Sequence, residues 1–229
     1  MSLLSVVAVA ARDAAAIAEV CTRLDPRLRL IAHVDVVLVA CEGDEQAPDP
    51  RNFVRWIQQL HARFDVMPMR FGEDLGDEAQ AMEILERRAP QVLLAIDAIV
   101  GRTEFGARLM IDVARADSEP MKSGEGSPRG RAYLYQRSAH YAAIDGIPAG
   151  LTNRVERLTH LMDMPQLKTR LDGPTKVSPY PCLSFLVERS AAAMLVARFE
   201  EHREILGCPS VLTGPWAPFN FVRECVAAG

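Results

Sequence analysis

The 229-residue sequence predicts an α+β protein with two βαββαβ-type domains, and three observations support this prediction. Short apolar runs rich in β-branched residues alternate with helical apolar stripes over residues 1–72. A long amphipathic stripe follows, from Leu75 to Val100. Beyond it, residues 105–113 place an apolar residue at every second position, which indicates a strand with one buried face and begins a second series of elements.

The first domain, residues 1–72, follows a clear order of strands and helices. In this order we expect a strand over 3–10, a helix capped by Asp13 and stopped by Pro26, strands over 28–31 and 34–40, a helix with Phe53, Ile57, Leu60 and Phe64 on one face, and a strand over 66–72. This order is the split-βαβ plan of a ferredoxin-like domain. The proline inside the last strand predicts an edge position or a bulge.

A long amphipathic helix, within residues 73–102, is expected to join this domain to a second one, and Pro90 is expected to kink or divide it. Residues 103–229 predict a modified ferredoxin-like domain, although no sequence repeat relates the two halves. Its expected elements are a strand over 105–113, a mobile loop over 117–129, helical segments over 133–144 and 151–162, strands near 167–171 and 183–187, a helix from Ser190, its N-cap, to Leu206, and a final strand.

Composition and charge exclude several classes of protein. The net charge of −4 and the isoelectric point near 5.8 argue against nucleic acid as the main partner, because phosphate binding favours a basic surface. The five cysteines are odd in number and lack a CxxC spacing, so we expect free thiols in a reducing cytosol. No apolar run approaches the roughly 18 residues that span a bilayer. We expect a cytoplasmic protein with no membrane partner, and the oligomeric state stays open.

The sequence contains no recognisable catalytic or metal-binding motif. Its five histidines form no HxxxH or HExxH pair, and no GxSxG motif is present. The glycine-rich stretch 124–130 has the wrong spacing for GxGxxG and contains a proline, so we interpret it as a plain loop. We therefore predict no catalytic residue, cofactor or metal site, and no enzymatic activity.

The segment 214–221 concentrates two prolines and three aromatic residues near the C-terminus. Since each proline fixes its own φ and disfavours the α region for the residue before it, we expect this arm to be extended and not helical. Its aromatic side chains are expected either to clamp the protein's own core or to contact a partner. The clamp is favoured, with Trp216 and either Phe219 or Phe221 folded back onto the sheet.

Arg70 is unusual because it interrupts the apolar strand predicted over 66–72. A buried arginine requires a carboxylate or carbonyl partner. We consider two roles for Arg70, a structural ion pair and contact with a partner protein. The neighbouring Met67 and Met69 are interpreted as core residues, because the methionine side chain fills irregular gaps.

Three segments carry a resemblance to a known family. Residues 66–72 resemble that family's VLPLRFG strand, and residues 130–137 resemble its GxAYLxxR helix start. Residues 213–221 are similar to its TGPWPPYSF segment, although Ala217 stands where the family usually has proline and Phe219-Asn220 where it has Tyr-Ser. These segments resemble the gas vesicle protein F/L family over about residues 50–222.

This resemblance implies a two-domain α+β accessory protein of gas vesicle assembly, without enzymatic activity. It implies binding to the small hydrophobic shell protein, help in nucleating or chaperoning the shell, other gas vesicle accessory proteins as further partners, and a gas vesicle-associated location in the cytoplasm. The residues that carry the family signature, and are expected to bind a partner or to stabilise the fold, are Arg70, Phe71, Tyr133, Trp216, Phe219 and Phe221.

Two alternative functions compete with this interpretation. Paired ferredoxin-like domains also occur as regulatory modules that bind small molecules between their sheets. An enzyme of the dimeric α+β barrel type would require a histidine or another reactive group directed into a cavity lined by a sheet, and no sequence feature places one there. We rank the assembly factor above the ligand-binding module, and that module above the enzyme.

Overall fold

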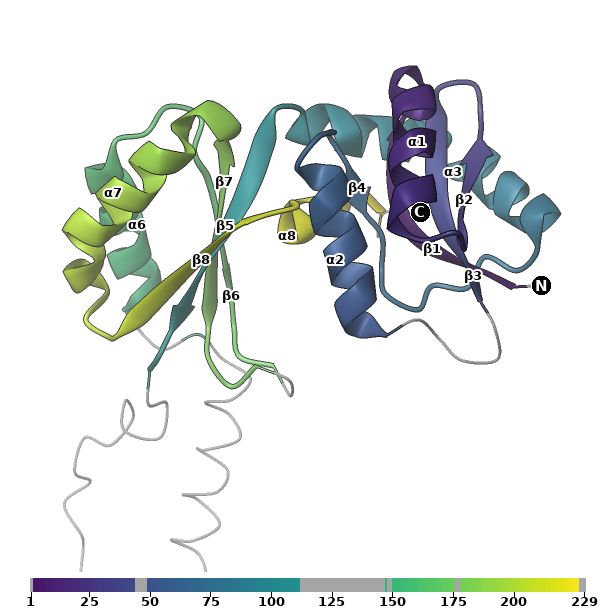
Figure 1. The fold of residues 1–229 in the computed structure, drawn as a ribbon. Coiled ribbons are helices and arrows are strands. Elements are labelled where there is room, and N and C mark those ends of the chain that lie inside the picture. Colours follow the sequence, from purple (N-terminus) through teal and green to yellow (C-terminus); the bar gives the residue numbers. More distant parts are fainter. Residues whose placement is uncertain (1, 44–48, 112–146, 148–149, 176–177, 227–229) are drawn as a thin grey trace, which may run out of the picture. The chain divides into compact units, whose positions relative to one another are not determined.

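The chain forms two compact units (Figure 1). The N-terminal unit comprises Met1–Glu104 together with Pro215–Gly229, and the C-terminal unit comprises Phe105–Gly214. The polypeptide therefore enters the C-terminal unit once and returns to the N-terminal unit for its last residues. The structure is a computed structural model that describes residues 2–43, 49–111, 147, 150–175 and 178–226.

The N-terminal unit is built on a four-stranded antiparallel sheet. Its elements are β1 (Ser2–Ala10), η1 (Ala11–Asp13), α1 (Ala14–Leu24), β2 (Leu28–Ala32), β3 (Val36–Gly43), α2 (Pro50–His61), β4 (Met67–Pro68), α3 (Glu78–Ile99) and α8 (Phe219–Val226). The strand order is β2-β3-β1-β4, and Val7 of β1 is aligned with Val39 of β3 on one side and with Pro68 of β4 on the other. A register shift between Ser5 and Val7 marks a bulge in β1.

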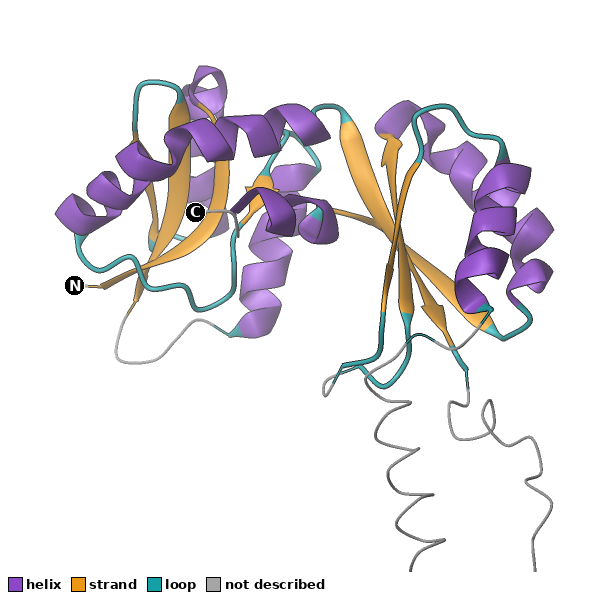
Figure 2. Ribbon diagram, turned by 180° about the vertical axis from the view of Figure 1, so that it is seen from behind, coloured by secondary structure: helices purple, strands orange, loops and turns teal. Residues whose placement is uncertain are grey.

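Helices cover both faces of this sheet. On one face, α1 and α2 share a hydrophobic core with β1, β2 and β3. The view from behind shows α3 across the opposite face, where it contacts all four strands (Figure 2). Val7 and Val9 belong to the core under α1 and α2, and the intervening Ala8 is also fully buried. Burial on both faces explains why β1 and β3 are almost continuously apolar.

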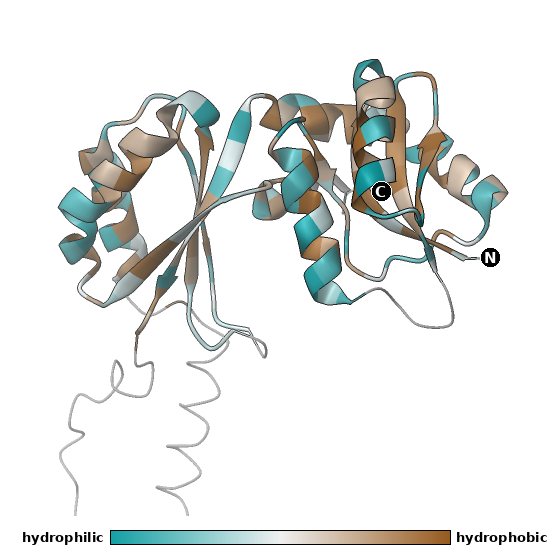
Figure 3. Cartoon of the chain, viewed as in Figure 1, coloured by the Kyte–Doolittle hydropathy of each residue, from teal (hydrophilic) through white to brown (hydrophobic). Residues whose placement is uncertain are grey.

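The start of α2 is defined by its capping residues. The Asp49 side chain accepts a hydrogen bond of 2.9 Å from the backbone N–H of Arg51. Pro50 occupies the first turn, where its missing N–H costs no helical hydrogen bond. Hydrophobic and hydrophilic bands alternate along α2 (Figure 3), which is the pattern of a helix with one buried side.

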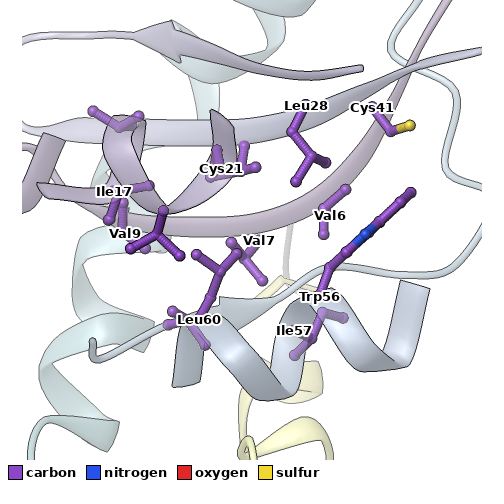
Figure 4. Packing of buried hydrophobic residues seen from close by; sticks show 14 of the residues in the cluster. Val6, Val7, Val9, Ile17, Cys21, Leu28, Cys41, Trp56, Ile57 and Leu60 are labelled. Carbon is purple, nitrogen blue, oxygen red and sulfur yellow. The ribbon is translucent and has the colours of Figure 1, made fainter. Parts of the chain in front are cut away.

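Trp56 is the largest fully buried side chain of the protein among the described residues. Together with Ile57 and Leu60 it projects from α2 into the core beside the strands (Figure 4). Its indole N–H has no hydrogen-bond partner among the described residues, and the Arg27 guanidinium lies 5.9 Å from the ring centroid. The stabilisation from Trp56 therefore comes from buried apolar area and from this cation–π contact.

The long helix α3 differs from the expected connector. It begins at a capping box formed by Asp77 and Gln80 and runs through Pro90 as one helix. Its apolar stripe, which includes the buried Leu85 and Val92, packs on the sheet of the N-terminal unit. The observed division of the chain thus differs from the expected boundaries, because α3 and the C-terminal segment both join the N-terminal unit.

The C-terminal unit contains a second four-stranded sheet. Its elements are β5 (Arg102–Leu109), α6 (Leu151–Met162), β6 (Lys168–Asp172), β7 (Cys182–Glu188), η2 (Arg189–Ala191), α7 (Ala192–His202), η3 (Arg203–Leu206) and β8 (Ser210–Trp216). The strand order is β6-β7-β5-β8. In each sheet, the strand that comes first in the sequence lies between the third and the fourth, and the second lies at the edge beside the third. The two units therefore share a sheet topology, although their sequences show no repeat.

Helices α6 and α7 share one hydrophobic core with this second sheet. Phe185 of β7 and Phe199 of α7 meet edge to face, with ring centroids 5.8 Å apart. The expected N-cap at Ser190 is wrong, because residues 189–191 form a 3-10 turn and α7 begins at Ala192.

The strands expected over 105–113, 167–171 and 183–187 are confirmed as β5, β6 and β7, with β5 ending earlier than expected. The loop predicted over 117–129 and the helical segment predicted over 133–144 lie outside the described residues.

The contrast between the two tryptophans generates a stability prediction. Trp56 is 0% exposed and Trp216 is 38% exposed. We expect Trp56→Ala to lower the free energy of unfolding by about 3–5 kcal/mol, because it removes a large buried side chain and leaves a cavity. Trp216→Ala is the matched control and is expected to cost less than about half as much. Urea unfolding monitored by circular dichroism measures the free energy of unfolding of both variants. Equal losses would contradict the finding that Trp56 is buried and Trp216 is exposed.

Candidate functional site

The C-terminal arm turns from strand into helix. Residues up to Trp216 belong to β8, and α8 begins at Phe219. The expectation that the whole arm is non-helical is therefore wrong for residues 219–221. Proline restricts its own φ and the residue before it but not the residues after it, so a helix is free to begin directly after Pro218.

Two buried side chains at the start of β5 bind the arm within the N-terminal unit. The Thr103 hydroxyl donates a hydrogen bond of 2.9 Å to the carbonyl oxygen of Trp216. Because the hydroxyl has a single proton, the 3.2 Å contact with His61 Nε2 requires the imidazole to donate. The Glu104 carboxylate accepts hydrogen bonds from the side-chain amide of Asn220 and, at 2.9 Å, from its backbone N–H. A carboxylate at the start of α8 also interacts favourably with the helix dipole.

The arm buries a different set of side chains from the one expected. Ala217 is fully buried in the core formed by α1, α2 and the sheet, and Phe219 packs against the same core. Val222 is buried, whereas Trp216 is exposed and Phe221 is half-buried. The described contacts of the arm therefore come from its backbone, from Ala217 and Val222, and from one aromatic ring, that of Phe219. A clamping role for the aromatic residues stays a prediction.

A groove of about 900 Å³ lies on the N-terminal unit, bounded by α2, α8 and the segment that follows β4. Its apolar lining includes Phe53 and Val54 from α2, Met69 and Phe71 from the segment around β4, and Phe219 and Val222 from α8. Val54 is 42% exposed and Phe71 is 41% exposed, so large apolar side chains face solvent here. An exposed apolar surface of this kind is typical of a binding site.

The segment around Arg70 forms a turn instead of the full strand predicted over 66–72. Strand β4 ends at Pro68, and the Met69 N–H donates one further hydrogen bond of 3.0 Å to the Val6 carbonyl oxygen of β1. The backbone N–H of Glu73 then donates to the carbonyl oxygen of Arg70 at 3.2 Å, and Gly72 adopts a φ of +74°, a conformation that favours glycine. This turn carries Phe71 outward, where its ring meets Phe53 edge to face at 5.1 Å.

The two arginines of the groove differ in their partners. The Arg88 guanidinium forms an ion pair of 2.9 Å with the Glu73 carboxylate. Arg70 is exposed, and its side chain makes no hydrogen bond or ion pair with any residue that the structure describes. The structural ion pair considered for Arg70 is thus not observed, and the groove presents an uncompensated positive charge beside its apolar lining.

The structure brings three of the six signature residues together. Arg70, Phe71 and Phe219 line the groove, Trp216 and Phe221 are not part of its lining, and Tyr133 lies outside the described residues. Sequence reasoning missed Glu104, Asn220 and the groove-lining role of Val54. The helical stripe through Phe53 could have indicated Val54 as a neighbour, but no local pattern relates Glu104 to a residue 116 positions away.

The resolved pKa shifts have structural causes. Burial raises the pKa of the Cys21 thiol to about 11. The hydrogen bonds from Arg27 lower the pKa of Asp25, and the Ser2 hydroxyl lowers that of Asp74. Within the described part of the chain, no group of three or more histidine, cysteine or acidic side chains is placed to bind a metal ion. Its helices also include none with the length and hydropathy needed to cross a membrane.

The fold and the groove define an α+β protein with two four-stranded sheets and an exposed apolar surface on its N-terminal unit. The family described as Gas vesicle synthesis protein GvpL/GvpF matches residues 5–223, and the chain belongs to this family. The resemblance carried by the three sequence segments is thereby confirmed.

Two crystal structures have a similar fold over almost the whole chain. The gas vesicle protein GvpF from Anabaena sp. PCC7120 has a TM-score of 0.60 at 13% sequence identity and covers 97% of this chain and 98% of its own. GvpF from Microcystis aeruginosa has a TM-score of 0.60 at 10% identity and covers 97% of this chain and 99% of its own. No curated protein sequence matches the chain significantly.

The contacts of Glu104 generate a second stability prediction. We expect Glu104→Gln to lower the free energy of unfolding by about 1.5–3 kcal/mol, because it weakens charge-assisted hydrogen bonds to the start of α8 in a buried position. Glu83→Gln on the exposed side of α3 is the matched control and should change stability by less than about 0.5 kcal/mol. Chemical denaturation measures both variants. Equal effects would contradict the anchoring role of Glu104.

Proposed function

We propose that this protein is an accessory factor of gas vesicle assembly that binds the small hydrophobic shell protein and keeps it competent for incorporation into the shell. Membership of the GvpL/GvpF family supports a role in gas vesicle formation. The observation that carries the proposal is the exposed apolar groove, with Val54 and Phe71 each more than 40% exposed.

The physical reason for such a factor lies in the properties of a subunit that polymerises. A hydrophobic shell subunit exposes apolar surface and strand edges before assembly, and both promote aggregation. A binding partner that covers this surface lowers the concentration of aggregation-prone protein. The groove supplies apolar area for such an interaction, and the two aromatic rings at 5.1 Å support one another in it.

The proposal also covers the fold of the two units, the location of the protein and its further partners. The shared strand order of the two sheets supports a ferredoxin-like plan for both units. The protein acts in the cytoplasm and at the growing vesicle. Other gas vesicle accessory proteins are further partners in this proposal.

Binding to the shell protein tests this function. Purified shell protein is diluted from denaturant with and without the full-length chain, and light scattering measures aggregation while a pull-down measures complex formation. We expect the chain to reduce scattering and to retain the shell protein. Absence of both effects with the wild-type chain would reject the proposed function.

A pair of exposed apolar positions provides the matched variants. Phe71→Asp places a charge in the groove and is expected to weaken binding about tenfold or more, because it removes an aromatic contact. Val34→Asp changes a residue that is 81% exposed, lies between β2 and β3 and is not part of the groove lining, so binding should be unchanged. Equal effects of the two variants would place the binding surface elsewhere.

A further inference from the structure

The shape of the groove favours one kind of occupant. Its walls are the helices α2 and α8 and the turn after β4, and α3 contributes Arg88. Its volume of about 900 Å³ accommodates several side chains of a partner at once. An apolar groove between helices is the surface on which an amphipathic helix docks, with side chains at i, i+3, i+4 and i+7 as anchors.

The alternative mode, in which a partner adds a strand to the sheet, is poorly supported at this site. The edge strand β4 is only two residues long, and one of them, Pro68, lacks the N–H that a pairing strand needs. Helix α8 contacts β4, and the chain turns away from the strand direction at Gly72. An added strand would therefore find few free backbone groups along this edge.

The charge of the groove specifies the occupant further. Glu73 neutralises Arg88 at 2.9 Å, whereas Arg70 has no ionic partner among the described residues. The planar guanidinium of arginine binds a carboxylate with two parallel hydrogen bonds. A partner segment with a carboxylate beside its apolar stripe would complement both the apolar lining of the groove and the positive charge of Arg70.

We propose that the groove binds an amphipathic helix whose apolar side contacts Val54, Phe71 and Phe219 and whose flanking carboxylate pairs with Arg70. The inference rests on the proposed function, since the helix belongs to the shell protein. It adds the secondary structure of the bound segment, the charge that the segment carries and the residue of this chain that recognises the charge.

A charge series at Arg70 tests the ionic part with purified shell protein and the full-length chain. We expect Arg70→Gln to raise the Kd about tenfold and Arg70→Glu to raise it more, because the first removes an attraction and the second adds a repulsion. Arg70→Lys keeps the charge without the planar fork and should fall between wild type and Arg70→Gln. Arg63→Glu is the matched control, because Arg63 is exposed and not part of the groove lining.

Salt dependence separates this ionic contact from a general loss of binding. The wild-type Kd should rise between low and high salt, and the Kd of Arg70→Gln should rise less, because salt screens an exposed ion pair. Circular dichroism melts confirm that each variant is folded. A charge series that leaves the Kd unchanged, or that Arg63→Glu reproduces, would overturn the role of Arg70.

Photocrosslinking tests the helical part. p-Benzoylphenylalanine replaces Phe71 in one variant and Val54 in another, and mass spectrometry maps the adducts on the shell protein. We expect adducts three or four residues apart in one segment, with an acidic residue within one helical turn. Adducts on alternate residues, or in a segment without an acidic residue, would overturn the inference.

The outcomes distinguish the two proposals. If the wild-type chain does not bind the shell protein, the proposed function and this inference both fail. The wild-type chain could instead bind while the substitutions at Arg70 leave the Kd unchanged and the crosslinks fall on alternate residues. In that case the proposed function stands and this inference alone fails.

Discussion

The arrangement of the N-terminal unit depends on the hydrogen bonds between the first residues of β5 and the returning C-terminal arm. Glu104 is buried, and a buried carboxylate requires donors close by. Asn220 supplies them from its backbone and its side chain. Thr103 adds a second attachment at the carbonyl oxygen of Trp216. These contacts fix the first turn of α8, and α8 supplies one wall of the groove.

The groove combines rigid support with exposed apolar surface. Phe71 is exposed because a glycine with positive φ turns the chain outward, yet its ring is oriented by the edge of Phe53. Glu73, next to this turn, accepts a hydrogen bond at its backbone carbonyl oxygen from the Ser5 N–H of β1 and another at its carboxylate from Arg88. The Phe71 ring is thus held by α2, and the turn beside it is held by β1 and α3. A surface prepared in this way loses less conformational entropy when it binds a partner.

Periodicity predicted the elements whose pattern is local. The strands β1 and β3 and the helices α1 and α2 follow from apolar runs and helical stripes within each segment, although Asp13 makes no side-chain capping hydrogen bond at α1. The packing of α3 on the first sheet was not predicted, because an apolar stripe indicates that one side of a helix is buried but does not identify the surface that covers it. The helix α8 was missed because the backbone N–H of Asn220, in its first turn, finds its acceptor at Glu104, 116 residues away. The family pattern identified Arg70, Phe71 and Phe219 without indicating that they share one groove.

The sequence by itself determined the α+β class, the order of the described strands and main helices before α8, and the family, because these depend on patterns within short segments. Only the tertiary structure decided that the C-terminal arm returns to the N-terminal unit, that Trp216 stays exposed and that Arg70 borders an apolar groove. The physical reason is that these features depend on hydrogen bonds and packing between residues far apart in the chain. Such contacts leave no periodic signal in the amino-acid sequence.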